Sequence, residues 1–316
     1  GSKYLRAQLD SIVGQDSLPD EIIVSDDCSS DNTWSILQEY ESKIGMKLFC
    51  NKKNLGYVKN FRLALSKSTS DIVAYCDQDD IWHRSKILCL RDEFSKDKQL
   101  GWAVSNARLI DENDHVMTDT LWERKNFTFL SRFLFKLNIL QFWILFRKNL
   151  MTGMVCAVRR DLIERTIPNQ IIPHDMFYLP LLSLIGYRGK AINAVLVSYR
   201  QHANQLFGVS IEKRNTISYQ EDFQNHRSFL KRRGVIYQEI LHHAGLNAVK
   251  FPAKINIKVL NIIRENLSKR IVFFEKEKLG FYEKIYLILA YLNPLNLLLF
   301  SVRSIVRELL IFYNRR

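Results

Sequence analysis

The stretch DIVAYCDQDDIW, residues 71–82, joins a short apolar run to a turn that carries three carboxylates. A short apolar run closed by polar residues is typical of a strand buried inside a parallel sheet, so we predict a strand over residues 71–76. The same pattern occurs upstream, where EIIVS (21–25) is followed by DDCSSD (26–31). Two apolar strands that each end in acids predict a place where carboxylates gather.

Helical periodicity separates these strands. Helices are expected over residues 4–13, 33–40 and 58–65 and from about residue 85, and further strands over 46–49, 102–105 and 151–158. Strands that alternate with helices indicate an α/β fold with a doubly wound, mostly parallel sheet, in which ligands bind beyond the carboxyl ends of the strands. The alternative is that Asp and Ser there only cap helices and solvate loops. Two acidic clusters at successive strand ends favour a site.

Composition narrows the class of protein. The 316 residues carry a formal charge of +13, and 47% of them are hydrophobic, which is enough for a sizeable core and excludes a disordered polymer. The charge suits an anionic partner: nucleic acid, a phosphorylated substrate or the inner face of a membrane. The five cysteines show no CxxC spacing, which favours reduced thiols and a cytoplasmic protein.

Asp77 and Asp79 form a DxD triplet directly after the predicted strand. On a tight turn, carboxylates at this spacing present oxygens to one hard divalent cation, Mg²⁺ or Mn²⁺. Such an ion bridges diphosphate oxygens and neutralises charge on a departing nucleoside diphosphate. The triplet alone is a weak signal, but its place between an apolar strand and Ile81-Trp82 strengthens the prediction.

Several motifs follow one another in order along residues 1–208. They are Tyr4-Leu5, Gln8-Leu9-Asp10-Ser11-Ile12 and Gln15; PDEIIVSDDCSSDNT at 19–33; Asn54-Leu55-Gly56 and Asn60; DQDDIW at 77–82 and Lys86; Thr152-Gly153-Met154; His174-Asp175; and Tyr199-Arg200-Gln201-His202 with Asn204, Gln205 and Gly208. Together they resemble the nucleotide-sugar half of the inverting family 2 glycosyltransferases, which implies a GT-A type fold. The DQDDIW form is similar to rhamnosyltransferase-type members that build bacterial surface polysaccharides.

The resemblance implies a role for each matching residue. Those implied to bind the nucleotide sugar are Asp26, Asp27, Asn54, Asp77, Lys86 and Arg200, the last two candidates for the diphosphate. The implied ligands of Mn²⁺ or Mg²⁺ are Asp77, Asp79 and His202. Asp175 is the implied general base, and Gly153 and His174 are implied to lie beside the acceptor or donor sugar. A single base implies direct displacement with inversion, because a sugar hydroxyl is a poor nucleophile that one carboxylate activates.

Each role has a plainer alternative. Asp175 is equally suited to be a helix N-cap. His202 taken alone is more often a surface or core histidine than a metal ligand, and Arg200 is able simply to pair with an acid. Gly153 would then only permit a turn or tight packing, and Trp82 is expected to be core.

The sequence departs from the family pattern in two places. Cys28 stands where many members have glycine, so its loop must either avoid a positive φ or bear strain. The family also begins with a strand ahead of a helix like that over residues 4–13, and here that strand is missing. We therefore expect this chain to be less stable and less active than a longer parent, since the loss of a central strand exposes its neighbours' edges.

The C-terminal region is different in character. We expect residues 1–208 to form the catalytic domain and residues 209–316 a basic, helical region that binds a membrane surface. Residues 285–300 are uncharged but too few to span a bilayer, so an interfacial helix pair is favoured over a buried hairpin. Residues 127–146 are a second candidate for a membrane-facing element, or for the acceptor groove. The expected location is the inner face of the cell membrane.

The favoured reading is transfer of a sugar, L-rhamnose from dTDP-rhamnose first and UDP-hexoses next, to a glycan or lipid-linked acceptor. A sugar nucleotidyltransferase is one rival, but the Gly-rich phosphate loop expected near its start is not found. A basic nucleic-acid-binding protein is the other, but it leaves the acidic strand ends unexplained. We therefore expect no nucleic-acid partner.

Overall fold

A computed structural model describes residues 1–136, 141, 144–145, 152–164, 174–203, 205, 228, 234–236, 238–240 and 242–243. The chain divides into two compact units, residues 1–141 with 149–209 and residues 142–148 with 210–316. The elements below belong to the first unit. The apolar segment at 285–300 lies outside the described residues, as do most of residues 137–151. Among the described residues, no helix combines the length and the apolar character that crossing a membrane requires.

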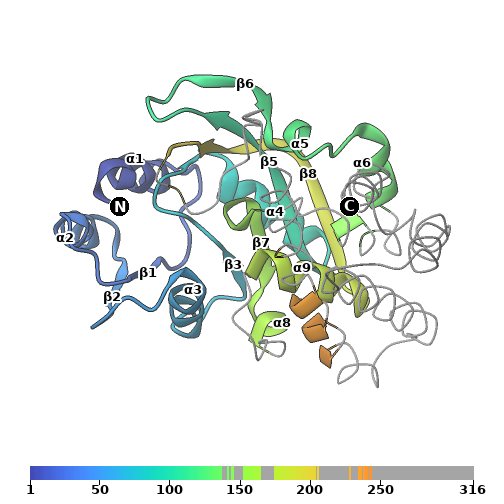
Figure 1. The fold of residues 1–316 in the computed structure, drawn as a ribbon, viewed down its shortest axis with the longest axis horizontal. Helices are drawn as coiled ribbons and strands as arrows, with labels where there is room; N and C mark the ends of the chain where they lie inside the picture. The colour runs from blue at the N-terminus through green and yellow to red at the C-terminus, as the bar shows by residue number, and fades with distance from the viewer. Residues whose placement is uncertain are drawn as a thin grey trace, which may run out of the picture. The chain divides into compact units, whose positions relative to one another are not determined.

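Helices and strands follow one another along the first unit (Figure 1). In chain order they are α1 (Ser2–Val13), β1 (Ile23–Asp26), α2 (Thr33–Ile44), β2 (Lys47–Cys50), α3 (Tyr57–Ser66), β3 (Ile72–Ala74), β4 (Ile81–Trp82), α4 (Lys86–Lys96), β5 (Leu100–Ile110), β6 (Val116–Thr120), α5 (Leu121–Arg124), α6 (Phe129–Phe135), the 3-10 helix η1 (Gly153–Val155), β7 (Cys156–Arg159), α8 (Arg160–Glu164), α9 (His174–Leu184) and β8 (Arg188–Arg200). The helices and strands predicted up to residue 96 are confirmed to within a few residues. They form where apolar runs or apolar helix faces have something to pack against.

The N-terminal part is a small layer of its own. β1 and β2 form a parallel two-stranded sheet, with Ile23 opposite Lys47. Helices α1 and α2 pack against each other beside it and bury Leu5, Leu9 and Leu37 in a shared core. These apolar positions recur at helical spacing, so one face of each helix is removed from water.

The larger sheet has six strands in the order β3-β7-β5-β8-β4, with β6 paired to β5. Its centre is the long parallel pair of β5 and β8, and the other pairs are antiparallel. The prediction of a mostly parallel sheet is therefore wrong for this part: the sheet is mixed. The alternation of strand and helix holds only as far as β3, since β4 follows β3 without a helix, and β6 returns on β5 as a hairpin.

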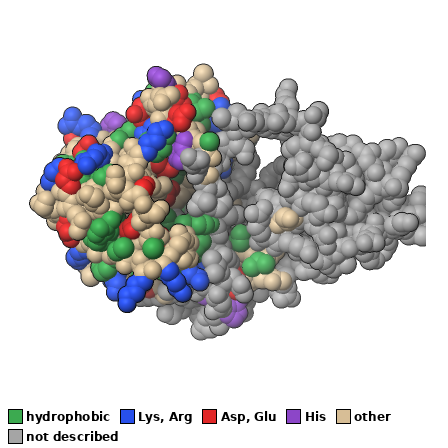
Figure 2. Space-filling model, turned by 60° about the vertical axis from the view of Figure 1, so that its left-hand side comes forward, with side chains coloured by type: hydrophobic (Ala, Val, Ile, Leu, Met, Phe, Trp, Pro, Cys, Tyr) green, Lys and Arg blue, Asp and Glu red, His purple; other side chains and the backbone are tan. Residues whose placement is uncertain are grey.

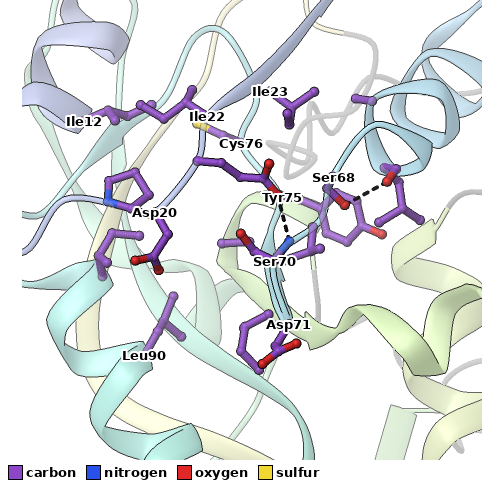
Figure 3. Close-up of a pocket in the computed structure, with 18 of the residues that line it drawn as sticks. Ile12, Asp20, Ile22, Ile23, Ser68, Ser70, Asp71, Tyr75, Cys76 and Leu90 are labelled. Carbon is purple, nitrogen blue, oxygen red and sulfur yellow. Dashed lines mark hydrogen bonds between the residues drawn. The ribbon is translucent and has the colours of Figure 1, made fainter. Parts of the chain in front are cut away.

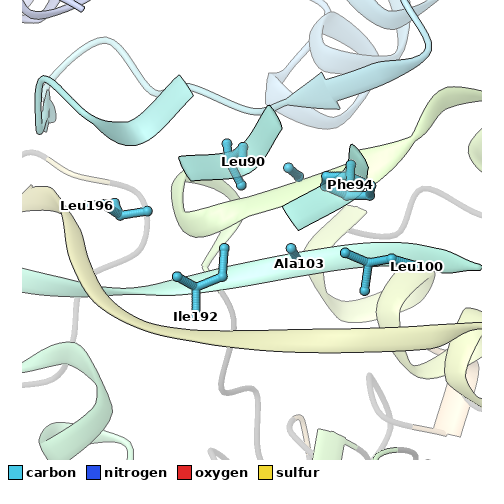
Figure 4. Close-up of a cluster of buried hydrophobic side chains, with 7 residues drawn as sticks. Leu90, Phe94, Leu100, Ala103, Ile192 and Leu196 are labelled. Carbon is cyan, nitrogen blue, oxygen red and sulfur yellow. The ribbon is translucent and has the colours of Figure 1, made fainter. Parts of the chain in front are cut away.

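The core of the larger sheet lies between α4 and the strands β5, β7 and β8. Leu90 and Phe94 of α4 pack on Leu100 and Ala103 of β5 and on Ile192 of β8 (Figure 4). Burying a leucine or phenylalanine side chain contributes about 1.5–3 kcal/mol, so this cluster is a main source of stability. Ala74 of β3 packs against it and Leu196 of β8 belongs to it, and these two strands lead to the candidate site.

β1 and β3 each have one edge that pairs with no other strand among the described residues. Ile22 and Asp26 bond to β2 through their carbonyls, and because backbone groups of alternate residues point to opposite sides, those of Ile23 point away from β2. On β3 the ladder to β7 runs through Asp71 and Tyr75, so the backbone of Ile72 points the other way.

These two edges face a common cavity of about 640 Å³ (Figure 3). Its walls include Ile22 and Ile23 on one side and Ile72 to Cys76 on the other. At the amino ends of the strands, the Glu21 carboxylate accepts hydrogen bonds from the backbone nitrogens of Thr69 (2.5 Å) and Ser70 (2.8 Å). The two sheets are thus tied together at one end and separated by an apolar slot above it.

Candidate active site

The acidic turn after β3 lies against the end of β8. The Asp79 carboxylate and the His202 imidazole are 2.9 Å apart, Oδ2 to Nε2, although 123 positions separate them in the sequence. Their side chains are 12% and 11% exposed, so both are open to solvent on one side only. The short strand β4 pairs with β8 immediately after the turn and holds the two segments together. The structure therefore brings together two of the predicted metal ligands.

Asp80 lies beneath this turn. Its side chain is fully buried, and Oδ1 accepts a hydrogen bond from the backbone nitrogen of Arg200 at 3.0 Å. Within the described part of the chain, Oδ2 has no hydrogen-bond partner. Burial, with the nearby charges of Asp77 and Asp79, raises the pKa of Asp80 well above its usual range. Asp80 therefore supports the turn from inside the fold.

Lys86 was predicted to contact the diphosphate, which stays a prediction, and the structure shows its side chain buried. The side chain is 1% exposed, and Nζ donates to the Met154 carbonyl at 2.6 Å and lies 4.0 Å from the centre of the Trp82 ring. Burial lowers the pKa of Lys86 to about 8, against the opposing effect of the Cys76 and Asp80 charges. In this structure the buried ammonium lies behind the acidic turn, where its charge acts on Asp80.

Arg200, the other predicted diphosphate contact, is also buried, and its role stays a prediction. Its side chain is 1% exposed, and Nε donates to the Asp79 carbonyl at 2.8 Å while Nη2 pairs with Asp114 at 2.7 Å. A third bond, from Nη1, goes to the Asp111 carbonyl at 3.2 Å. The guanidinium is thus committed to the protein, as in the alternative reading in which Arg200 pairs with an acid.

The loop after β1 uses its carboxylates internally. Asp27 accepts hydrogen bonds from Asn51 and from the backbone nitrogens of Leu55 and Gly56, at 2.8–2.9 Å. Asp26 accepts from Ser29, through both its backbone nitrogen and its hydroxyl. Asp26 and Asp27 were predicted to bind the nucleotide, and this stays a prediction, because the structure shows their carboxylates organising the loop.

Three further residues lie in this loop or beside it. Asn54 accepts from the Gly56 nitrogen at 3.0 Å and is exposed at the tip of the turn. Cys28 has φ of +63°, so the loop adopts the left-handed conformation that its glycine-like position requires and bears the strain. Asp31 accepts from the amino group of Gly1 at 2.8 Å, and this bond, with others from Ser2 and Thr33, holds the pKa of Asp31 far below its usual range.

The remaining predicted residues are placed less fully. Asp77 lies in the same turn as Asp79, and Gly153 begins η1, next to the residue whose carbonyl binds Lys86. His174 and Asp175 form the first turn of α9, but their side chains lie outside the described part. Their roles as sugar-binding residue and general base stay predictions.

Sequence reasoning missed Tyr4 as a part of the site. Its ring centre lies 4.3 Å from the Arg200 guanidinium and 5.1 Å from the His202 ring, so it packs between both. An arginine over an aromatic face is attracted by the ring quadrupole. Tyr4 opens the motif series in the sequence, but its neighbours are distant in sequence, and no local pattern signals the contact.

Asp79 and His202 supply part of the ligand shell that a divalent cation requires. A carboxylate and an imidazole within 2.9 Å of each other are oxygen and nitrogen ligands that suit Mn²⁺. Among the described residues, no group of three or more His, Cys, Asp and Glu is arranged to hold a metal, so Asp79 and His202 would supply two ligands. A substrate diphosphate and water would complete the shell, as is usual for such ions.

Comparison with known proteins gives relatives of one kind. A dTDP-rhamnosyl transferase, RfbG of Shigella flexneri, is 36% identical over 94 residues, which are 28% of this chain and 32% of the relative. A putative teichuronic acid biosynthesis glycosyltransferase, TuaG of Bacillus subtilis, is 34% identical over 86 residues, 27% of this chain and 34% of the relative. The chain thus has homologues in polysaccharide biosynthesis. Other curated relatives match over 212 residues that make up 57% of their length, so the chain spans only part of the proteins it matches.

Among solved structures, S. aureus TarS 1–349 in complex with UDP is similar, with a TM-score of 0.53 and 16% identity. The match covers 99% of this chain and 86% of that one, and at this identity it shows the fold alone, a mixed α/β fold of GT-A type. The family model of glycosyl transferase family 2 matches residues 2–165, just over half of the 316 residues. The chain therefore belongs to glycosyl transferase family 2.

Proposed function

We propose that this chain transfers a sugar from a nucleotide donor to a hydroxyl group of a glycan or lipid-linked acceptor, with inversion and with a divalent metal. The observation that carries the proposal is the pair of Asp79 and His202, held at the carboxyl end of β3 in a family 2 chain. Carboxyl ends of strands are where α/β sheets bind their ligands. The pair is the one place among the described residues where two predicted ligands of the diphosphate-bound metal meet.

Each group of the chain has a task in this reaction. A bound metal supplies charge neutralisation on the departing nucleoside diphosphate. Asp79 and His202 hold that ion, while Lys86, buried behind the turn, offsets the mutual repulsion of its carboxylates. Asp175, at the start of α9, is proposed to take the proton from the acceptor hydroxyl as that oxygen attacks the sugar carbon.

We propose L-rhamnose from dTDP-rhamnose as the first donor to test, with UDP-hexoses second, in the synthesis of a bacterial surface polysaccharide. Support for rhamnose comes from the DQDDIW turn and the name of the Shigella relative, and support for UDP-sugars from the UDP held by TarS. The teichuronic acid relative supports a surface polymer as the product.

The test is release of nucleoside diphosphate from a panel of dTDP- and UDP-sugars, with Mn²⁺ and with EDTA. We expect one donor to be used, with activity abolished by EDTA and by Asp79→Ala but retained in Asp92→Ala, an exposed acid on α4 that serves as the matched control. If the folded protein binds no nucleotide, the glycosyltransferase proposal is wrong. Binding of DNA that does not need metal would instead favour the nucleic-acid alternative, although acidic and basic side chains are mixed over the described face in Figure 2.

We also propose that an extended apolar strand, joined directly ahead of Gly1, belongs in the slot between β1 and β3. Both edges that line the slot have backbone groups directed into it, and its walls between the strands are mainly apolar, which is what a strand buried in a sheet requires. Gly1 lies where both strands finish: its amino group bonds Asp31, and a Cβ on it would come within 3.3 Å of Gln78. A strand that ends at Gly1 would therefore run parallel to both neighbours and lead into α1.

Extending the chain tests this strand proposal. Four apolar residues such as Val-Ile-Ile-Val, fused ahead of Gly1, would span roughly 13 Å as a strand, about the length of β1. We expect this version to melt several degrees higher and to turn over faster than a control extended by Gly-Ser-Gly-Ser. Equal melting temperatures and turnover for the two would contradict the proposal.

Finally, we propose that the protein works in the cytoplasm at the inner face of the membrane, through its basic C-terminal region. The support is compositional: a net charge of +13 and an uncharged stretch at 285–300 between basic residues. Co-sedimentation with anionic vesicles at low salt is the test, and failure to bind them would remove this part of the proposal.

A further inference from the structure

The hairpin of β5 and β6 reaches the candidate site through its tip. Asp111 fixes the tip by accepting from the backbone nitrogens of Asn113 (2.8 Å) and His115 (2.9 Å). Asp114, between Asn113 and His115, has φ of +68°, and its carboxylate lies 2.7 Å from the Arg200 guanidinium. An exposed acid on a surface hairpin is therefore the counter-ion of a fully buried arginine.

Arg200 in turn contacts the acidic turn after β3. Its Nε binds the Asp79 carbonyl at 2.8 Å, and its backbone nitrogen binds Asp80 at 3.0 Å. The planar guanidinium donates in fixed directions, so its contacts to Asp114, Asp111 and Asp79 fix one orientation. The main chain of Asp79 is thus held while its carboxylate faces His202.

The physical reason for Asp114 follows from what Arg200 would do without it. A buried guanidinium that loses its anion is strongly destabilised and turns toward any other carboxylate within reach. Asp79 and Asp111, whose carbonyls the guanidinium binds, and Asp80, which binds the Arg200 backbone nitrogen, are the other acidic residues among its contacts. An Arg200–Asp79 ion pair would compete with a metal ion for the same oxygens.

We propose that Asp114, acting through Arg200, is a positioning residue that keeps the Asp79 carboxylate free for the metal and the nucleotide sugar. The proposal rests on the proposed function, in which Asp79 and His202 hold a divalent ion. It gives the β5–β6 hairpin a role in metal affinity although no predicted ligand lies on it.

The experiment uses two substitutions that tolerate the positive φ. Asp114→Gly removes the carboxylate, and Asp114→Asn keeps a hydrogen-bond acceptor but no charge. The matched control is Glu112→Gln in the same hairpin tip, whose exposed side chain forms an ion pair with Lys3. For each variant, Mn²⁺ binding is titrated by the loss of the free-ion electron paramagnetic resonance signal, and kcat and KM for the donor are measured.

We expect Asp114→Gly to weaken Mn²⁺ binding about tenfold and Asp114→Asn less, with the control within twofold of the unchanged chain, since one lost charge-assisted contact corresponds to roughly that factor. KM for the donor should rise more than kcat falls, because binding is affected before chemistry. Unchanged Mn²⁺ affinity in both Asp114 variants would overturn the inference.

A second measurement keeps the inference separate from the proposed function. In metal-free protein, we expect faster deuterium uptake over residues 77–82 in Asp114→Gly than in Glu112→Gln, because the turn loses its anchored arginine. If the unchanged chain binds no Mn²⁺, the proposed metal site fails, and the exchange data alone decide whether Asp114 positions the turn. Equal uptake in the two variants would then reject the inference.

Discussion

The loops after β1 and β3 are alike in sequence and unlike in structure. Both follow a short apolar strand, and both are rich in aspartate. In the first loop, backbone nitrogens and short polar side chains satisfy Asp26 and Asp27. In the second, Asp79 meets the imidazole of His202, just after β8, and a lysine and an arginine are buried behind the turn.

From this difference we infer that the partner of a carboxylate decides its role. A carboxylate bound by backbone N–H groups shapes the loop, and its removal leaves buried donors unpaired. A partly exposed carboxylate that shares its oxygens with a histidine is able to give them to a metal ion. We therefore expect the first loop to govern stability and the second to govern activity, and four substitutions test this separation.

The largest effect is expected from Asp79→Asn. This change keeps the size of the side chain but removes the charge that the metal requires, so kcat/KM should fall by about 10³, roughly 4 kcal/mol of transition-state stabilisation. The melting temperature should move by only a degree or two. A large loss of stability with little loss of activity would reverse the assignment of the two loops.

Asp27→Ala is the counterpart in the first loop. It leaves the backbone nitrogen of Leu55 without its acceptor and that of Gly56 with Asn54 alone, so we expect a loss of about 1–3 kcal/mol in the free energy of unfolding. Thermal melting checks this, with Asp92→Ala as the exposed control. The KM for the donor, measured on folded protein, decides whether Asp27 also binds the nucleotide: an unchanged KM would confine it to the loop.

Local sequence was sufficient for the first half of the fold and insufficient for the second. The strands over 21–25, 46–49 and 71–76 were predictable because each is one apolar run with a clear end. β5 extends to Ile110, well beyond the predicted residues 102–105, because pairing with β8 accommodates polar residues such as Asn106 that interrupt the run. β8 was missed altogether, since its mixed pattern of apolar and polar residues depends on which sheet neighbours it has.

The site shows the same division. Asp79 and His202 were predictable through the order of the motifs, and the structure brings them together. The burial of Lys86 and Arg200 was not, because a buried charge is tolerated only where partners are supplied, and these come from distant segments: Met154 lies 68 positions from Lys86. Without knowledge of those buried partners, the sequence pattern of basic residues beside an acidic turn predicts ligand binding.

Glu21→Gln tests a carboxylate at the opposite, amino ends of β1 and β3. Burial raises the pKa of Glu21, but hydrogen bonds from Thr69, Ser70 and Lys47 outweigh it and lower the pKa to about 2. A depressed carboxyl pKa stabilises the fold above the unfolded value near 4.5, and this stabilisation is lost as pH falls toward 2.

We expect Glu21→Gln to cost about 1–2 kcal/mol at pH 7, because charge-assisted hydrogen bonds become neutral ones. Thermal melting at several pH values should show the gap between this variant and the unchanged chain closing as pH falls from about 4.5 to about 2. Glu112→Gln is the control, as an exposed glutamate elsewhere on the surface. A gap that stays constant over this range would exclude Glu21 ionisation as its source.

The smallest effect is expected from Cys28→Gly, which tests how the first loop is held. Cys28 has φ of +63°, a conformation that costs a residue with a Cβ about 1–2 kcal/mol. Glycine removes that strain but adds freedom to the unfolded chain worth about 0.4–1 kcal/mol, so the net gain should be about 0.5–1 kcal/mol. Cys28→Ser separates strain from the loss of the exposed thiol, since serine keeps the Cβ. If the glycine variant melts no higher than the serine variant, the positive φ of Cys28 carries no measurable strain. The hydrogen bonds of Asp26 and Asp27 then hold the loop without strain, and these aspartates have more freedom to turn toward a ligand than the contrast between the two loops implies.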